Sequence, residues 1–521
     1  MSDPRLSRVI DVLEQEGAGR LADYLARQRW FGSKGRCIAT VRLTDSARLA
    51  ETPGLVILAI FCVEFTDGPG ESYFLPLIAR PSETTSESPD PAAVPLAEDS
   101  EAGAVSDATY DSAASLALVQ AIGECRRWDG RRGVFTCHVT QEGRAGFADI
   151  PRRPKRIAAE QSNTSIVYDR RMILKVIRKL ESGTNPDREI LEFLTTRTQY
   201  RHVPLLLGAI EYNEHADPSH KTTVALLQSF IENEGDGWSY TIEHVRALLS
   251  ESRRVPNQGG EGNARELVHR FSAEYRQNIR RLGEITGSLH VALQSDPSDA
   301  AFRPDPMSRH DVDTWKQAMV SQVDAIMAQC RTLPEPTFST IGLTRQDLRA
   351  LLMNVRLRIE GFPVASVEGL MKIRVHGDYH LGQVLKTPDS FAILDFEGEP
   401  ARPLHERRAK QCAAKDVAGM VRSFSYAAEM ATRDPGGTAP GTHALAQIWE
   451  EATVAAFLEG YRSITRLYET SVLPGNPEHF DRLLRFFELD KAVYELRYEL
   501  NNRPDWLAVP VNGVRRIVEA G

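Results

Sequence analysis

The pattern of hydrophobic and polar positions divides the chain into a strand-rich first part and a helical second part. The clearest strands are the apolar runs Leu55–Phe65 and Tyr73–Ala79, and the turn sequence at 66–70 between them predicts a hairpin. Residues 5–29 differ, because apolar residues recur there at about every fourth position and predict helix. Further strands are expected at Cys37–Leu43, Gly133–Val139, Ile157–Gln161, Ser165–Tyr168, Met172–Arg178, Leu205–Glu211 and Thr222–Ile231.

After residue 235, apolar residues recur every three or four positions, as the buried faces of helices require. The series from Leu267 to Leu289 is the clearest example and predicts one buried helical stripe, with a Gly- and Asn-rich loop at 253–264 before it. Strands first and helices later favour an α+β fold over a parallel, doubly wound sheet. Further helices are expected at 311–330, 344–360, 406–431, 443–468 and 477–501.

Composition adds one segment to this picture and excludes one class of partner. Residues 81–114 are rich in Ser, Pro, Ala, Asp and Glu and have no periodic apolar face, which predicts a flexible linker. The chain has 521 residues, enough for about three domains. Its net charge of −8 argues against nucleic acid as a partner, because nucleic-acid binding needs a basic face.

Cysteine spacing and hydropathy give two further expectations. The six cysteines contain no C-x-x-C pair, which argues against a zinc site and against a disulfide framework. The longest apolar run, Leu55–Val63, is far shorter than the about 20 residues of a membrane helix, and the acidic N-terminus is unlike a signal peptide. We therefore expect a cytoplasmic protein with no membrane-spanning segment.

The most informative segment for chemistry is 373–400. It contains a His-Gly-Asp sequence that ends at Asp378, then Gln383 five residues later and Asp395 after an apolar strand. In protein kinases an aspartate on a tight loop accepts the proton of the attacking hydroxyl, while an amide and a second aspartate hold Mg²⁺. Asp378 is therefore the candidate base, Gln383 and Asp395 are candidate metal ligands, and His376 is expected to be a scaffold. The alternative is a loop whose residues only satisfy one another's hydrogen bonds.

A kinase also needs a strand lysine that binds the ATP phosphates and a helix acid that positions it. Lys175 lies inside the apolar segment 171–177, and lysine is rarely buried without a partner. Glu189 follows in the first turn of a helix predicted to begin at Asn185 and Pro186, so we expect a Lys175–Glu189 ion pair. The alternative for Lys175 is an edge strand with the lysine facing water.

The Gly-rich phosphate loop of protein kinases does not precede Lys175 in the sequence. The residues Ser162, Asn163, Thr164 and Ser165 stand there instead, between two predicted strands. The backbone N–H groups and hydroxyls of such a turn can bind a phosphate of ATP. The alternative is an ordinary hairpin turn.

These segments together resemble the maltokinase family, which are sugar kinases related to the aminoglycoside phosphotransferases and, more distantly, to protein kinases. The resemblance covers nearly the whole chain except 81–114 and 253–264. Six segments carry it: RQRWFGSKGR at 27–36, QSNTS at 161–165, the strand with ILK at 173–175, HGDYHLGQVL at 376–385, DFEGEP at 395–400 and KAVYELRYELNNRPDW at 491–506.

The resemblance implies a bilobal, protein-kinase-like fold. ATP with Mg²⁺ would bind between the lobes, and maltose would be phosphorylated at its anomeric hydroxyl in the C-terminal lobe. The product, maltose 1-phosphate, feeds glycogen and α-glucan synthesis in a pathway that begins with trehalose synthase, a candidate docking partner of the cap. The implied parts are a β-rich N-terminal cap subdomain over 1–80, the linker over 81–114, a β-rich intermediate nucleotide-binding subdomain over 115–233 and an all-helical C-terminal lobe over 234–521.

One helix is the candidate sugar-binding element. Lys491, Tyr494 and Tyr498 share a helix face, and a lysine beside aromatic rings suits a sugar, whose ring faces stack and whose hydroxyls form hydrogen bonds. The family resemblance places this face in the maltose pocket with Asp378, and it makes Arg503 either a sugar contact or a helix cap. Without the resemblance, a tyrosine stripe packed inside the lobe is the favoured interpretation.

The predicted reaction is direct in-line phosphoryl transfer. Asp378 would orient the sugar hydroxyl and accept its proton, Gln383 and Asp395 would hold Mg²⁺ on ATP, and Lys175 would neutralise phosphate charge. Asp416 resembles the helix aspartate that fixes the catalytic loop of kinases. Two alternative functions stay open: a kinase for another small acceptor, such as glucosamine or an aminoglycoside, and a non-catalytic kinase-like binding module.

Overall fold

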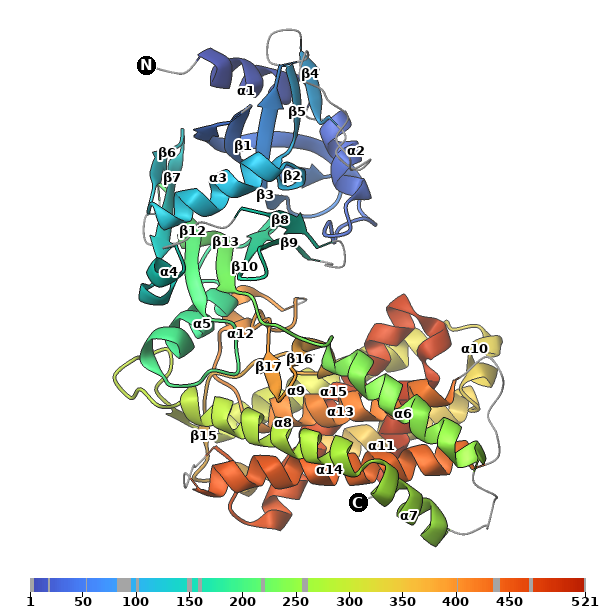
Figure 1. Cartoon of the computed structure of the whole chain (residues 1–521). Helices are drawn as coiled ribbons and strands as arrows, with labels where there is room; N and C mark the ends of the chain where they lie inside the picture. The colour runs from blue at the N-terminus through green and yellow to red at the C-terminus, as the bar shows by residue number, and fades with distance from the viewer. Residues whose placement is uncertain are drawn as a thin grey trace. The chain divides into compact units, whose positions relative to one another are not determined.

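The computed structural model describes most of the chain, and Figure 1 shows its course. The chain forms two compact units: the first comprises residues 1–197 and 203–232, and the second comprises residues 198–202 and 233–521. No helix within the described ranges is both long and apolar enough to cross a membrane. The described ranges are 4–16, 19–52, 54–81, 95–99, 103–147, 152–157, 162–216, 221–254, 261–400, 402–433, 441–467 and 472–519.

The first unit begins with two helices and an antiparallel sheet in the order β1-β2-β3-β5-β4, with β11 paired to β3. Leu13 and Leu25 of the helices and Phe31 after them share a buried core with Phe61 and Tyr73 of the sheet. The helices and strands are α1 (Pro4–Glu16), α2 (Arg20–Arg27), β1 (Ile38–Glu51), β2 (Leu55–Phe65), β3 (Glu71–Arg80), β4 (Ala97–Asp99), β5 (Gly103–Asp107) and β11 (Lys179–Leu180).

The structure corrects the expectation of a linker over 81–114. Residues 82–94 and 100–102 of this interval lie outside the described residues. Most of the others form β4, β5, a 3-10 helix (Ala108–Tyr110) and the start of α3 (Ser112–Gly123). β5 pairs with β3 along Leu77–Arg80 and buries Val105. Pairing with a neighbouring strand holds this segment in place, and a polar composition does not reveal such pairing.

A second antiparallel sheet completes the first unit, in the order β6-β7-β12-β13-β10-β9-β8. Helix α3 packs with both sheets, because its Leu118 and Ile122 share one buried core with Ile60 of β2 and Phe135 of β7. The remaining elements of this unit are β6 (Arg127–Asp129), β7 (Gly133–Val139), α4 (Gln141–Gly146), β8 (Pro154–Arg156), β9 (Asn163–Tyr168), β10 (Met172–Ile177), α5 (Pro186–Arg197), β12 (Leu206–Glu214) and β13 (Lys221–Ser229).

A buried ion pair also links the two sheets of the first unit. Arg178, directly after β10, donates from Nη2 to Oδ2 of Asp107 on β5 at 2.8 Å. Its Nε donates to Oγ1 of Thr164 on β9 at 2.8 Å, and Tyr24 donates to Asp107 Oδ2 at 2.7 Å. The side chains of Arg178 and Asp107 are 0% and 1% exposed, and hydrogen bonds within the protein engage Nε and Nη2 of Arg178 while Nη1 is buried without a partner among the described residues.

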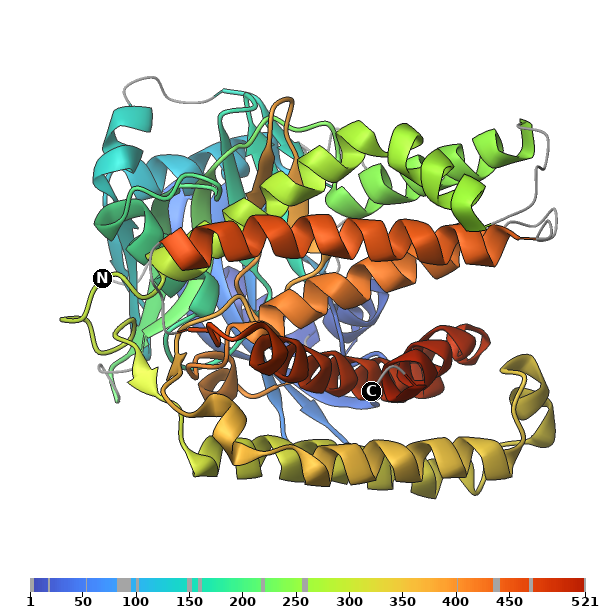
Figure 2. The same ribbon diagram turned by 90° about the horizontal axis from the view of Figure 1, so that it is seen from below.

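The second unit is largely helical, and its longest helices pack closely. Helix α14 lies alongside α8, as Figure 2 shows for the orange-red and yellow-green helices. Gly283 on α8 permits this approach, because a Cβ there would lie 2.0 Å from the carbonyl oxygen of Phe457 on α14. Helix α13 packs against α15. The helices are α6 (Gly237–Arg254), α7 (Glu261–Phe271), α8 (Ala273–Ala292), α9 (Arg309–Cys330), α10 (Glu335–Thr340), α11 (Arg345–Gly361), α12 (Leu404–Arg407), α13 (Ala414–Thr432), α14 (Thr442–Leu467), α15 (Pro477–Asn502) and α16 (Ala508–Glu519).

Two short antiparallel strand pairs accompany these helices: β14 (Asp305–Pro306) with β15 (Met371–Lys372), and β16 (Val384–Lys386) with β17 (Phe391–Ile393). The second pair is a hairpin, and the predicted metal ligands Gln383 and Asp395 lie just before and just after it. The α+β fold predicted from the sequence, with antiparallel sheets first and a helical region last, is confirmed.

Three helix expectations need correction. The loop expected at 253–264 is helical at both ends, because α6 continues to Arg254 and α7 begins at Glu261, while residues 255–260 lie outside the described residues. The stripe from Leu267 to Leu289 belongs to two helices that break at Ser272, and Phe271 is 37% exposed. The helix expected at 406–431 is also two helices, because α12 ends before the irregular segment 408–413 that precedes α13.

Candidate active site

Asp416, in the first turn of α13, fixes the loop that carries the predicted catalytic base. Its carboxylate accepts hydrogen bonds from the backbone N–H groups of His376 at 2.7 Å and Gly377 at 2.9 Å. Gly377 has a φ of +85°, a left-handed conformation that favours glycine. Burial raises the pKa of Asp416, but hydrogen bonds from His290 and from the loop outweigh burial, and the net shift is downward. These contacts confirm the loop-fixing role predicted for Asp416.

His376 is a scaffold residue, as predicted. Its Nε2 donates to the carbonyl oxygen of Leu394 at 2.8 Å, and its Nδ1 accepts from the backbone N–H of Asp378 at 3.3 Å. The ring also packs against Phe396, with ring centroids 4.9 Å apart. Both ring nitrogens are engaged with the backbone, so the ring connects the loop of Asp378 to the segment that follows β17.

Asp378 lines a pocket of the second unit together with Lys491 of α15. Lys491 Nζ donates to Asp378 Oδ1 at 3.0 Å, and His380 Nε2 lies 3.9 Å from Oδ2. Burial raises the pKa of the Asp378 carboxyl, but Lys491 and His380 outweigh burial and bring the pKa below its ordinary value. Asp378 is therefore ionised and can accept a hydrogen bond from a hydroxyl in the pocket.

Glu399 is a pocket residue that the sequence reasoning did not assign. Lys491 donates to its Oε1 at 3.2 Å, and Arg402 donates to its Oε2 at 2.5 Å. Burial lowers the pKa of Lys491, but Asp378 and Glu399 outweigh burial and the net shift is upward. Lys491 therefore stays charged between two carboxylates. In the sequence, Glu399 is visible as an acid four residues after Asp395. It was not assigned because Asp395 was already the predicted metal ligand of that segment.

The structure separates the predicted sugar-binding residues of α15. Tyr494 lines the pocket, and Lys491 Nζ lies 4.8 Å from the centroid of its ring. Tyr498 stacks on Tyr494 but is 44% exposed and does not line this pocket. Arg503 pairs with Glu499 at 2.6 Å and stands at the C-terminal end of α15, which favours the helix-end alternative for this residue.

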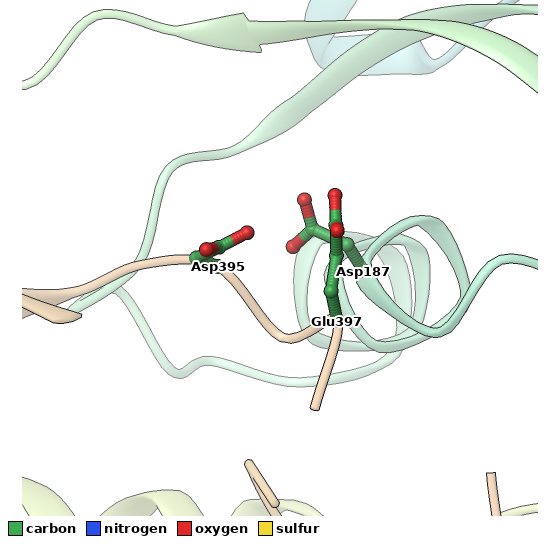
Figure 3. Close-up of side chains that lie close together, drawn as sticks. All are labelled: Asp187, Asp395 and Glu397. Carbon is green, nitrogen blue, oxygen red and sulfur yellow. The ribbon is translucent and has the colours of Figure 1, made fainter. Parts of the chain in front are cut away.

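The β16–β17 hairpin brings the predicted metal ligands together. Gln383 stands directly before β16, Asp395 follows β17, and Gln383 Nε2 donates to Asp395 Oδ2 at 3.3 Å. An oxygen of Glu397 lies within 4.8 Å of an Asp395 oxygen, and Figure 3 shows both side chains on one loop. Asp395 has a φ of +64°, which is uncommon for a residue other than glycine and is often found at functional sites. An amide oxygen and two carboxylates are hard ligands that suit Mg²⁺.

Lys175, on β10 of the first unit, has a carboxylate partner that the sequence reasoning did not name. Its Nζ donates to Oδ2 of Asp187 at 3.2 Å, and Asp187 begins α5, as Figure 3 also shows. Gln228 Nε2 donates to the same oxygen at 3.4 Å. The predicted helix start is confirmed, because Asn185 caps the first turn of α5. The pairing of Lys175 with Glu189 stays a prediction.

Most of the residues expected to form a turn at 162–165 lie in a strand instead. Asn163, Thr164 and Ser165 belong to β9 and pair with β10, where Ser165 lies opposite Lys175. All three side chains are buried, and the Thr164 hydroxyl accepts from Arg178. The Ser165 hydroxyl has no hydrogen-bond partner among the described residues, and the role of these three residues in ATP binding stays a prediction. Ser162 stands before the strand and is exposed, so its role in ATP binding stays a prediction.

The fold and these residues define a kinase-like phosphotransferase. Residues 24–111 match the family model of the maltokinase N-terminal cap domain, which extends through β5 and so past the expected cap boundary at residue 80. The sequence is 25% identical over 357 residues to a glucosamine kinase of Streptacidiphilus jiangxiensis, covering 68% of this chain and 71% of that protein. It is 24% identical over 368 residues to a glucosamine kinase of Mycolicibacterium smegmatis, covering 70% and 79% respectively.

A solved structure supports the same fold. It is a glucosamine kinase in complex with glucosamine, ADP and inorganic phosphate, with a TM-score of 0.63, 20% identity, and coverage of 95% of this chain and 98% of that chain. The resemblance drawn from the sequence motifs is therefore confirmed as a likeness: the N-terminal region matches the maltokinase cap model, and the chain has the fold of a glucosamine kinase.

Proposed function

We propose that the protein is an ATP-dependent kinase that phosphorylates maltose at its anomeric hydroxyl and releases maltose 1-phosphate. The observation that carries this proposal is the pairing of Asp378 with Lys491 in a pocket that Tyr494 also lines. The carboxylate can accept a hydroxyl proton, the ammonium can donate to sugar oxygens, and the aromatic ring can stack on a sugar face. The cap match at 24–111 supports a maltokinase-type acceptor.

The electrostatics of Asp378 favour an anomeric acceptor. The ring oxygen withdraws electron density from the anomeric hydroxyl, which is therefore more acidic than the other hydroxyls of a sugar. A base whose pKa is lowered, as Lys491 lowers that of Asp378, loses less driving force with a more acidic hydroxyl.

The remaining residues have proposed roles toward ATP. Gln383 and Asp395 would hold Mg²⁺, with Glu397 as a further oxygen donor, and when bound the ion would neutralise charge on the phosphates during transfer. Lys175 would neutralise phosphate charge on the nucleotide side. Glu189 remains a proposed positioning residue for that lysine.

An acceptor screen tests the proposal directly. The full chain is incubated with ATP, Mg²⁺ and one of maltose, glucose, glucosamine or kanamycin, and ADP release is followed. Phosphorus NMR of the product distinguishes an anomeric phosphate from a phosphate on a primary hydroxyl. We expect maltose to be the best acceptor and to give an acid-labile anomeric phosphate. A phosphate at another position would contradict the proposed chemistry.

Glucosamine is the second candidate acceptor, because both similar sequences and the similar structure described above are glucosamine kinases. The same screen separates the candidates, since glucosamine carries an ammonium group and maltose does not. If none of the four acceptors is phosphorylated, a non-catalytic binding module would be the better description of the protein.

The cap and the pathway context remain part of the proposal. Docking of the cap onto trehalose synthase would deliver maltose to the kinase on the way to glycogen and α-glucan. Co-purification of trehalose synthase with the full chain, compared with a chain that lacks the matched cap residues 24–111, tests this docking. Equal recovery with both chains would exclude the cap as the docking element.

A further inference from the structure

Two charged side chains of the pocket remain without a partner after the contacts of the described residues are assigned. Lys491 bridges Asp378 and Glu399, and Glu399 also pairs with Arg402. By contrast, Asp490 on α15 and Lys415 on α13 line the same pocket without a side-chain hydrogen bond or ion pair to any described residue. The chemistry described so far gives these two side chains no role.

The position of Asp490 directs it toward the pocket. Phe487, Asp490, Lys491 and Tyr494 are spaced along α15 so that they share one face, and all four line the pocket. Lys415 reaches the pocket from the first turn of α13, which packs against α15.

The two unpartnered groups attract one another without touching. Burial raises the pKa of Asp490, and Lys415 is the strongest of the cations that oppose this rise. No oxygen of Asp490 lies within the 4.0 Å of Lys415 Nζ that would make an ion pair. Asp490 lines the pocket and its carboxylate oxygens are open to it, so a ligand can donate hydrogen bonds to them in place of water.

A neutral sugar ring fits this arrangement. Adjacent hydroxyls can donate to the two oxygens of one carboxylate, and an ammonium can donate to a hydroxyl or ring oxygen. Asp490 could also accept from the ammonium group of an amino sugar, because the pocket lining holds four carboxylates against three cationic side chains.

We propose that Asp490 and Lys415 bind ring hydroxyls of the acceptor. This inference rests on the proposed function, because it concerns the acceptor side of the same pocket. It assigns these residues to acceptor binding, and it leaves proton transfer to Asp378.

The test uses Asp490→Asn and Lys415→Gln in the full chain. For Asp490→Asn we expect the KM for maltose to rise by about tenfold or more, the size of a lost charged hydrogen bond, with the KM for ATP unchanged. For Lys415→Gln we expect the KM for maltose to rise as well, because the amide can donate to a hydroxyl but carries no charge, with the KM for ATP again unchanged.

Glu488→Gln is the matched control. Glu488 is an acid two residues before Asp490 on α15, it does not line the pocket, and it has no described side-chain partner. We expect both KM values of this variant to equal those of the wild type. If Asp490→Asn does not fold, Asp490→Ser removes the carboxylate without adding an unpaired amide and replaces it in the assay.

The wild type and the variants test different statements. If the wild-type screen shows glucosamine as the better acceptor, the proposed maltose specificity is wrong. The contact of Asp490 with the acceptor is then decided by the KM of Asp490→Asn for glucosamine. An unchanged KM for the best acceptor in both Asp490→Asn and Lys415→Gln would overturn the inference even if maltose is the substrate.

Discussion

Lys491 binds two carboxylates with one ammonium group: its Nζ lies 3.0 Å from Asp378 Oδ1 and 3.2 Å from Glu399 Oε1. The arrangement joins α15 to the loop of the predicted base and to the segment after β17. Asp378 has a lowered pKa chiefly because this lysine outweighs its burial. The basicity of Asp378 therefore depends on a residue 113 positions away in the sequence.

Replacement of Lys491 should change the pH dependence of turnover. In Lys491→Met the burial of Asp378 remains and its main counter-charge is lost, so its pKa rises. The base is then protonated at a higher pH, so the fall of kcat on the acidic side of the pH–rate profile occurs at a higher pH. A pH–rate profile measures this shift. Lys410→Met, which removes a lysine paired with Asp305 outside the pocket, should leave this fall at its wild-type pH.

Asp378→Asn should fold normally and lose most of its turnover. The amide keeps the shape of the carboxylate but cannot accept a proton, and loss of a general base lowers kcat by roughly a hundredfold to ten-thousandfold. Steady-state kinetics with maltose give kcat, and thermal unfolding reports the fold. Asp389→Asn, at an exposed aspartate in the β16–β17 turn, is the control. Turnover near the wild-type rate in Asp378→Asn would remove it from the role of base.

Asp395→Asn should weaken the response to Mg²⁺ while preserving the backbone. Asparagine tolerates the left-handed φ of +64° at this position, so the loop keeps its conformation. The loss of a charged oxygen should raise the Mg²⁺ concentration at half-maximal rate by about tenfold or more. Titration of Mg²⁺ at saturating ATP measures this value. A normal titration would exclude Asp395 as a metal ligand.

Glu488 should make the stability of the second unit depend on pH. Burial raises its pKa from the ordinary value of 4.5 to about 7, so between these values the folded state binds more protons than the unfolded state. Stability therefore falls as the pH rises through this window, by at most about 3 kcal/mol. Glu488→Gln should remove this fall, so its melting temperature should change less between about pH 5 and about pH 8 than that of the wild type.

The pH dependence of stability that we assign to Glu488 arises from its burial, so an exposed acid should not show it. Glu368→Gln, at an exposed acid that follows the 3-10 helix 364–367, should keep the wild-type pH dependence. A wild-type pH profile in Glu488→Gln would show that Glu488 titrates in its ordinary range.

The buried pair of Arg178 and Asp107 should matter more for stability than an exposed pair does. Arg178→Met leaves Asp107 as an unpaired buried charge, which costs about 3–5 kcal/mol of unfolding free energy. Urea unfolding followed by circular dichroism measures the loss. Arg42→Met breaks an exposed pair with Glu64 and should change the unfolding midpoint little. Equal effects of the two substitutions would contradict the argument from burial.

Much of the catalytic loop could be predicted from the sequence, because its chemistry is local. The distances of five residues from Asp378 to Gln383 and of 17 residues to Asp395 describe one loop and one hairpin, and short-range geometry preserves such spacing. The helix start at Asn185 and Pro186 was visible for the same reason.

Contacts between distant segments were not predictable in this way. Asp187 as the partner of Lys175 depends on how α5 meets β10, and Asp187 and Glu189 are equally plausible acids in the sequence. Glu399 and Asp490 acquire a role only when α15 lies beside the loop of Asp378. The polar strand β5 was hidden because its pairing with β3, and not its composition, makes it a strand.

The β16–β17 hairpin has a consequence for comparing this chain with remote relatives. Gln383 and Asp395 are neighbours because they stand at the open end of a hairpin, and its turn lies at the other end. Residues added in pairs near that turn would lengthen the hairpin and leave the two side chains adjacent. A search that fixes the number of residues between the amide and the aspartate would therefore miss proteins with the same pair of predicted ligands on a longer hairpin.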